Sequence, residues 1–130
     1  MREILFRGKR IADGKWMYGL PSYDEYGNIE EIQVWDGEDI SFCLVDPETI
    51  CQYTGLTDKN GKKIWEGDIL SGYLDDDFPE AETRVLVLWQ ENGWCAKQLE
   101  CNGYEKLDVW YSEYFEVIGN VVDNPKLLEV

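Results

Sequence analysis

The chain is 130 residues long and carries 27 acidic against 12 basic residues, which gives a net charge of −15 at pH 7. Nucleic-acid binding depends largely on Lys and Arg displacing the counterions around phosphates, so this charge argues against direct binding to DNA, RNA or an anionic membrane. Because the sequence contains no histidine, it also excludes the serine and cysteine triads that use His as their base.

The composition is typical of a protein of the cytoplasm. Residues 1–4 lack the apolar stretch of a signal peptide, and no apolar run approaches the roughly 20 residues that cross a bilayer. A chain of this length buries enough surface to fold as one domain, residues 1–130, without disulfides or a metal. We therefore expect a soluble, cytoplasmic protein with reduced cysteines and no cofactor.

In chain order, the first predicted element is a β-hairpin. Residues 3–7 and 15–20 are apolar stretches on either side of a turn at Asp13 and Gly14. Pro21 is expected to end the second strand, because it cannot donate a backbone hydrogen bond.

The next segment predicts two half-buried strands joined around residues 36–39. Its apolar residues alternate with polar or smaller ones, which is the two-residue period of a strand with one covered face. They are Ile32, Val34, Ile40, Phe42 and Leu44.

Tight corners separate the strands that follow. Residues 50–53 form a short strand, and the turn residues of 57–61 lead to another at 63–65. A second corner, at residues 66–68, opens a strand over residues 69–74.

An acidic loop over residues 75–82, with Phe78 inside it, comes before the clearest hairpin of the chain. The strands of this hairpin are residues 84–89 and 94–99, and Glu91, Asn92 and Gly93 turn it.

The C-terminal part predicts strands over residues 107–111 and 115–122, separated by one helical turn that Ser112 would cap. Asn124 and Pro125 open a short terminal helix.

Nine or ten short strands with regular turn signals predict an all-β protein. We expect a small barrel-like body, SH3-like or a pseudo-barrel, with an N-terminal β-hairpin region and one or two short helical turns. The alternative to one undivided domain is an N-terminal β lobe over residues 1–50 and a barrel-like body over residues 51–130.

Several segments, taken together and in order, resemble the YopX family of small phage and prophage proteins. They are residues 6–9 and 16–19, the stretch 52–64, residues 66–70, and residues 115–120 with Asn124 and Pro125. The resemblance covers nearly the whole chain, except for the acidic loop and residues 95–108. It implies a mostly β protein with a small barrel-like body that self-associates, and it supplies no established activity and no catalytic residues.

The physical interpretation of these motifs is structural. Gly55, Gly61, Gly67 and Gly119 stand where tight corners or a close backbone approach leave no room for a Cβ atom. Asp58 is expected to accept hydrogen bonds from backbone N–H groups two residues further on, which closes an Asx-turn, and Asp68 to do the same at the next corner.

Metal sites are weakly supported. A zinc site would need Cys43, Cys51, Cys95 and Cys101, but the seven- and five-residue spacings differ from those of structural zinc sites. Half-buried thiols in strands are the simpler interpretation. Calcium at residues 75–77 is disfavoured because adjacent aspartates point in different directions and lack the glycine of a calcium loop.

Enzymatic chemistry also lacks a specific signal. Paired carboxylates beside tryptophans could suggest sugar hydrolysis. With 27 acidic residues in the chain, however, such proximity is expected by chance. Trp89 and Trp94 are better explained as core residues, and no phosphate-binding glycine motif occurs.

The residue patterns together with the YopX resemblance, which implies a phage or prophage origin and self-association, favour a non-enzymatic accessory protein. It would act through protein–protein contacts, including self-association as a homo-oligomer and contacts with a host or phage protein. Two alternatives stay open: an acidic DNA mimic that inhibits a host DNA-binding protein, and a small carboxylate-based hydrolase. No catalytic, cofactor-binding or metal residue is assigned, and the binding residues are unknown.

Overall fold

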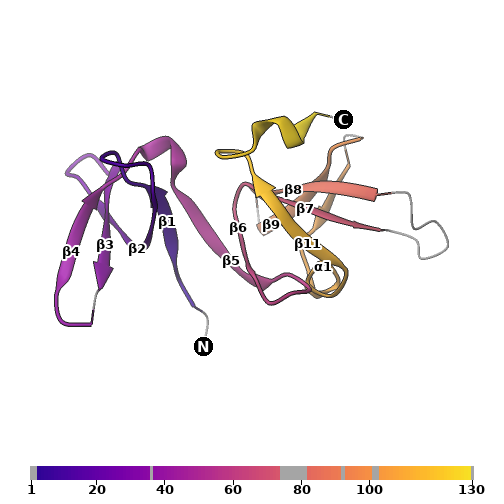
Figure 1. Ribbon diagram of the computed structural model, residues 1–130, viewed down its shortest axis with the longest axis horizontal. Coiled ribbons are helices and arrows are strands. Elements are labelled where there is room, and N and C mark those ends of the chain that lie inside the picture. Colours follow the sequence, from indigo (N-terminus) through magenta and orange to yellow (C-terminus); the bar gives the residue numbers. More distant parts are fainter. Residues whose placement is uncertain (1–2, 36, 74–81, 92, 101–102, 130) are drawn as a thin grey trace. The chain divides into compact units, whose positions relative to one another are not determined.

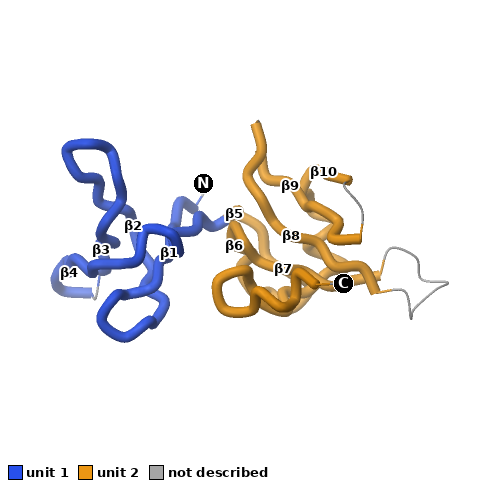
Figure 2. Tube along the Cα trace, turned by 90° about the horizontal axis from the view of Figure 1, so that it is seen from above, with its two compact units in different colours: residues 1–53 blue, residues 54–130 orange. Residues whose placement is uncertain are grey.

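The computed structural model describes residues 3–35, 37–73, 82–91, 93–100 and 103–129. These residues are mostly β-strands, as the sequence predicts, and the strands form antiparallel sheets (Figure 1). The chain divides into two compact units, residues 1–53 and 54–130, which we call the N-terminal and C-terminal units (Figure 2). The single-domain prediction and its alternative boundary after residue 50 stay predictions.

The N-terminal unit is built from one antiparallel meander. Its elements are β1 (Phe6–Lys9), β2 (Trp16–Tyr23), β3 (Ile29–Trp35), β4 (Ile40–Leu44), the 3-10 helix η1 (Pro47–Thr49), and the beginning of β5 (Cys51–Thr57). Neighbouring strands follow the order β4-β3-β2-β1-β5. The predicted hairpins over β1–β2 and β3–β4 are both present.

Backbone contacts connect the end of β4 to the chain just after β1. Arg10 and Val45 form an isolated antiparallel bridge, and the Ile11 N–H donates to the Leu44 carbonyl at 3.1 Å. The bridge brings Val45 against β1, where a Cβ atom added at Gly8 would lie only 3.2 Å from the Val45 side chain. The inner side of this curled sheet buries Ile32 and Val45 completely.

The expected end of β2 at Pro21 is wrong. β2 continues through Pro21, which lies opposite Ile32 of β3. The pairing with β1 stops at Gly19, so β2 has a strand on one flank only at Pro21. A missing N–H group is tolerated on an open flank of this kind.

The C-terminal unit holds the larger core. Its elements are β6 (Lys63–Trp65), β7 (Asp68–Tyr73), β8 (Glu82–Gln90), β9 (Gly93–Gln98), β10 (Tyr104–Lys106), the helix α1 (Val109–Tyr114), β11 (Phe115–Asn120) and the 3-10 helix η2 (Pro125–Leu128). The end of β5 pairs with β6, and the remaining strands follow the order β10-β9-β8-β7-β11. The predicted hairpin of β8 and β9 is confirmed.

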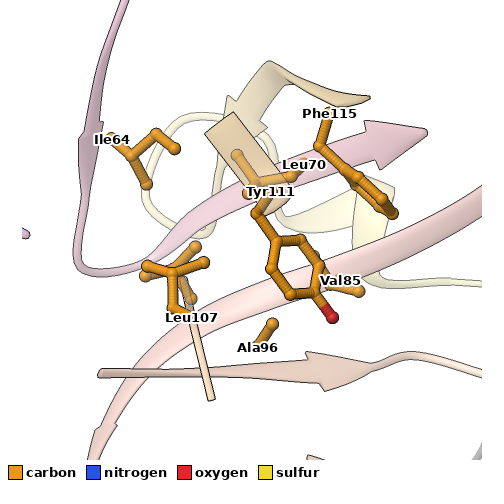
Figure 3. Packing of buried hydrophobic residues seen from close by; sticks show 8 residues of the cluster. Ile64, Leu70, Val85, Ala96, Leu107, Tyr111 and Phe115 are labelled. Carbon is orange, nitrogen blue, oxygen red and sulfur yellow. The ribbon is translucent and has the colours of Figure 1, made fainter. Parts of the chain in front are cut away.

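The core forms where α1 packs on this sheet. Figure 3 shows the Tyr111 ring directed toward the strands that carry Val85 and Ala96. Phe115 is fully buried, and its ring centroid lies 4.9 Å from that of Tyr111. The other buried members of this cluster are Ile64, Leu70, Val87 and Leu107.

Two local predictions near this core are wrong. Residues 107–111 do not form a strand, because α1 begins at Val109, and the residue that caps it is Asp108 rather than Ser112. The Asp108 carboxylate accepts a hydrogen bond from the Trp110 N–H at 3.0 Å, which satisfies a backbone donor at the start of the helix. Trp89 is not a core residue either, since its side chain is 52% exposed, whereas Trp94 packs against the core.

The corner motifs behave largely as expected. Asp58 closes an Asx-turn by accepting hydrogen bonds from the N–H groups of Asn60 and Lys62, both at 2.9 Å. Asp68 instead accepts a bond from Trp65, which precedes it, at 2.8 Å. At Gly119, an added Cβ atom would lie 2.6 Å from the Asn124 side chain, so the close approach expected there is confirmed.

The barrel-like detail of the fold prediction is not confirmed. In the described part of the chain the strand orders have two ends, and the sheets do not close into a barrel. The predicted acidic loop, including Phe78, lies outside the described residues except for Glu82, which begins β8.

Candidate functional site

The most unusual surface of the N-terminal unit is one side of its sheet. Residues that lie directly opposite each other on neighbouring strands point to the same side, and Leu20 of β2, Gln33 of β3 and Phe42 of β4 form one such row. Trp35 and Ile40 form the next row. We call the outer face the side that carries Tyr18, Leu20, Trp35, Ile40, Phe42 and Leu44.

All six of these large apolar side chains are exposed. Their exposed fractions are 46% for Tyr18, 50% for Leu20, 64% for Trp35, 55% for Ile40, 59% for Phe42 and 55% for Leu44. Single exposed apolar residues are ordinary, whereas a contiguous group of this kind is uncommon on the surface of a monomeric protein.

The expected burial of β4 is therefore wrong. Ile40, Phe42 and Leu44 alternate as predicted, but they face outward, while Ser41 and Cys43 lie on the opposite side. The inner side of the sheet buries Ile32 and Val45, while Ile40, Phe42 and Leu44 stay exposed on the other side.

The outer face is hollowed into a groove of about 470 Å³. Its lining residues are Leu5, Tyr18, Gly19, Leu20, Gln33, Trp35 and Ile40. These described lining residues are uncharged, so they offer apolar contact and one amide group.

Charge is distributed unevenly around the outer face. No lysine or arginine occurs between residues 16 and 58, so the basic residues of the N-terminal unit all precede β2. On β1, the Arg7 guanidinium lies 4.3 Å and the Lys9 ammonium 5.2 Å from the Trp16 ring centroid. Glu38 and Asp39 directly precede β4. The charged residues of the β3–β4 segment, residues 29–44, are all acidic.

A larger hollow, of about 540 Å³, lies in the C-terminal unit. It is lined by Gln90, Glu91, Gly93, Trp94, Cys95, Lys106 and Leu107. Its lining includes one carboxylate, whereas glycoside hydrolysis uses a pair of acids on either side of the bond that is cleaved. Trp94 and Leu107 belong to or pack against the core, so this hollow is a gap at the edge of the core.

The candidate metal ligands are not brought together in the described structure. Cys43 and Cys95 are partly exposed, Cys51 is buried and its thiol donates to the Thr49 carbonyl, and Cys101 lies outside the described residues. Within the described ranges no group of three His, Cys, Asp or Glu residues could hold a metal ion. Residues 75–77, considered for calcium, are also outside those ranges. No helix in the described part of the chain has the length and apolarity needed to cross a membrane.

The most perturbed buried group is the Tyr111 phenol, which is 1% exposed. Its hydroxyl donates to the Glu105 carboxylate at 2.8 Å. Burial, and then this hydrogen bond to a negative group, raise the pKa of Tyr111 well above its ordinary value of 10.0.

This pKa shift predicts a loss of stability at high pH. The unfolded chain releases the Tyr111 proton near pH 10 while the folded protein keeps it, so the free energy of unfolding should fall as pH rises above about 10. The contribution of one proton is at most about 1.4 kcal/mol per pH unit. Chemical denaturation of Tyr111→Phe between pH 9 and 11 should show a shallower decline than the wild type. Tyr114→Phe, which alters an exposed tyrosine of the same helix, is the control, and equal slopes for both variants would refute the assignment.

Fold and surface together define a class: a mostly β protein of two units, with a packed C-terminal core and an exposed apolar face on its N-terminal sheet. A family model described as YopX protein matches residues 5–129, so the chain belongs to the YopX family. The resemblance seen in the sequence motifs is thereby confirmed.

The chain is also similar in fold to protein EF1440 from Enterococcus faecalis, which is known from a crystal structure. The TM-score is 0.60 at 22% sequence identity, over 99% of this chain and 100% of that chain. At this identity the likeness shows the fold alone. No curated protein matches the chain significantly.

Sequence reasoning did not find the outer face. One signal for it was present in β4 (Ile40–Leu44). Its large apolar residues alternate with two smaller residues, Ser41 and Cys43. The absence of basic residues between Lys15 and Lys59 was a second signal, because it separates the charges of the two hairpins.

Proposed function

We propose that this protein is a non-enzymatic phage or prophage accessory protein of the cytoplasm, which acts through protein–protein contacts of its outer face, including contacts with itself. The observation that carries the proposal is the group of six large apolar side chains exposed on one side of the β2–β3–β4 sheet. A surface of this kind is stabilised when a second protein covers it and removes apolar area from water.

The chemistry of the surface supports a binding role over a catalytic one. The described residues that line the groove are uncharged, and most of them are aromatic or aliphatic. Aromatic side chains such as Trp35 and Tyr18 are enriched where protein–protein contacts are strongest, because they bury a large area at low entropic cost.

A serine at Phe42 should weaken self-association. Burying a Phe side chain contributes about 1.5–3 kcal/mol, so Phe42→Ser should raise the dissociation constant by about tenfold or more. Sedimentation equilibrium over a range of concentrations measures this constant, with the 15.2 kDa chain as the monomer reference.

Tyr26→Ser is the matched control, because Tyr26 is 80% exposed in the turn between β2 and β3 and is not part of the outer face. Its dissociation constant should equal that of the wild type. If both variants associate as tightly as the wild type, the outer face is not the contact surface.

A further inference from the structure

We infer that the outer face of one copy contacts a basic face on the C-terminal unit of a second copy. This inference rests on the proposed function and adds to it the partner surface and the residues that meet. It is argued from a carboxylate on the outer face, from two lysines on the C-terminal sheet, and from the strand registers that place them.

A carboxylate lies among the apolar side chains of the outer face. Glu31 of β3 lies opposite Leu44 of β4, so it points to the same side as Leu44, and it is half-buried there. Arg10, which an isolated bridge with Val45 brings to this end of β4, pairs with Asp13 and not with Glu31. Burying a charge without a partner is costly, so a molecule that covers the outer face has to supply a positive group for Glu31.

The outer face of a second copy does not offer such a group. The basic residues on this side of β1 are Arg7 and Lys9, and both are engaged with the Trp16 ring, at 4.3 Å and 5.2 Å from its centroid. The strands β2, β3 and β4 contain no lysine or arginine. Two outer faces packed together would therefore bury two Glu31 carboxylates and add no cation for them.

The C-terminal sheet has a side that suits Glu31. Its strands β8 and β9 turn Val85 and Ala96 into the core, so the residues that alternate with these point away from the core. The register carries this second side onto β10, where Tyr104 lies opposite Lys97 (Figure 2). We call the basic face the side that carries Leu86, Leu88, Cys95, Lys97, Tyr104 and Lys106.

The basic face combines positive charge with apolar area. Leu86 and Leu88 are half-buried, and the Tyr104 side chain is 46% exposed. The Lys97 ammonium lies 5.8 Å from the Tyr104 ring centroid, and Lys106 is exposed. Among the described residues, neither lysine forms an ion pair with a carboxylate. The basic face and the outer face are thus both partly apolar, and their charges have opposite signs.

Charge complementarity selects the basic face as the partner of the outer face. Each chain has a net charge of −15, so two copies repel each other except where opposite charges meet. Glu31 of one copy then meets Lys97 of the other, and Lys106 lies one level further along the same face. Because the two faces belong to different units, the contact is head-to-tail and repeats from copy to copy. We therefore expect assemblies larger than a dimer.

Mixing two charge-reversed variants tests this contact. Glu31→Lys alone and Lys97→Glu alone should each raise the dissociation constant by about tenfold, since like charges then meet at every contact. An equimolar mixture of the two should return to within about threefold of the wild type. In the mixture each variant can contact the other with opposite charges at both of its faces. Sedimentation equilibrium at 0.15 M salt measures the wild type, both variants and the mixture.

Two variants with the same changes of charge are the controls. Glu25→Lys lies in the turn between β2 and β3, Lys62→Glu lies in the turn before β6, and both side chains are exposed. Each should keep the dissociation constant within about threefold of the wild type. Net charge alone predicts tighter association for Glu31→Lys, which is less negative, so weaker association cannot come from overall repulsion. Thermal unfolding followed by tryptophan fluorescence checks that each variant is folded, and Glu31→Gln with Lys97→Gln replaces the pair if either reversal unfolds the chain. Each Gln variant should then weaken association, and unchanged association in both would overturn the inference.

The outcomes separate this inference from the proposed function. Recovery in the mixture supports the head-to-tail contact. If the mixture is as weak as the single variants, or if the single variants associate like the wild type, while Phe42→Ser still dissociates the protein, the outer face is a contact surface but the basic face is not its partner. If the wild type stays monomeric at millimolar concentration, both self-association and this inference are overturned.

Discussion

Replacing Asp58 with alanine should lower the free energy of unfolding of the C-terminal unit by about 3–5 kcal/mol. The Asp58 side chain is 4% exposed and accepts three backbone hydrogen bonds. One oxygen holds the turn through Asn60 and Lys62, and the other accepts from the Val117 N–H of β11 at 2.9 Å. Alanine removes both acceptor oxygens, and with them all three bonds, and leaves a backbone donor of β11 without its partner.

Asp58→Asn separates the two roles of this carboxylate. The amide oxygen still closes the turn, but the amide nitrogen is a donor and cannot accept from Val117. We therefore expect roughly half of the alanine effect. Urea denaturation followed by the fluorescence of Trp94 and Trp110 measures both variants. Equal effects of Asn and Ala would show that the bond to Val117 carries nearly all of the stability, and no effect of Ala would contradict the structural role of Asp58.

Gly19→Ala should disrupt the N-terminal sheet, at a cost of about 3 kcal/mol or more. A Cβ atom added at Gly19 would lie 1.9 Å from the backbone carbonyl oxygen of Gln33 on the neighbouring strand. This contact is with backbone, so no change of rotamer relieves it, and β2 and β3 must move apart. Because Gly19 also lines the groove, the variant should lose self-association together with sheet stability.

Gly93→Ala is the control for this substitution. Gly93 has no heavy atom within 4 Å of the added Cβ position and is not among the residues with positive φ. Its effect on stability should stay within about 0.5 kcal/mol, as for ordinary surface changes. Hydrogen exchange at the amides of β2 and β3 should rise in Gly19→Ala and not in Gly93→Ala, and unchanged protection in Gly19→Ala would refute the close contact.

The hairpins could be predicted from the sequence because local chemistry determines them. Glu91, Asn92 and Gly93 between two apolar runs predicted the hairpin of β8 and β9, and the structure pairs these strands in register. Asp58 and Gly61 predicted a closed turn, and the turn is closed by bonds within five residues of sequence. These hairpins and turns are held together by residues that are close in the chain. The sequence of a short segment is therefore enough to predict them.

Long-range partners could not be predicted in this way. The sequence shows that Asp58 holds its own turn, but its second oxygen binds Val117, which is 59 residues away. Likewise, Asp108 rather than Ser112 caps α1, because the buried position of Tyr111 in the core places the start of the helix at Val109. These choices depend on which distant segments pack together.

By itself the sequence determined the all-β class, the main hairpins, the corner residues and the family, since period, turn chemistry and motif order are properties of the chain. Only the tertiary structure decided which side of β4 is covered. A two-residue period divides a strand into two faces but does not say which of them meets a core. Ile32 and Val45 fill the inner side, and Ile40, Phe42 and Leu44 consequently face outward. The outer face is a result of that packing, because the same alternation would equally allow these residues to be buried.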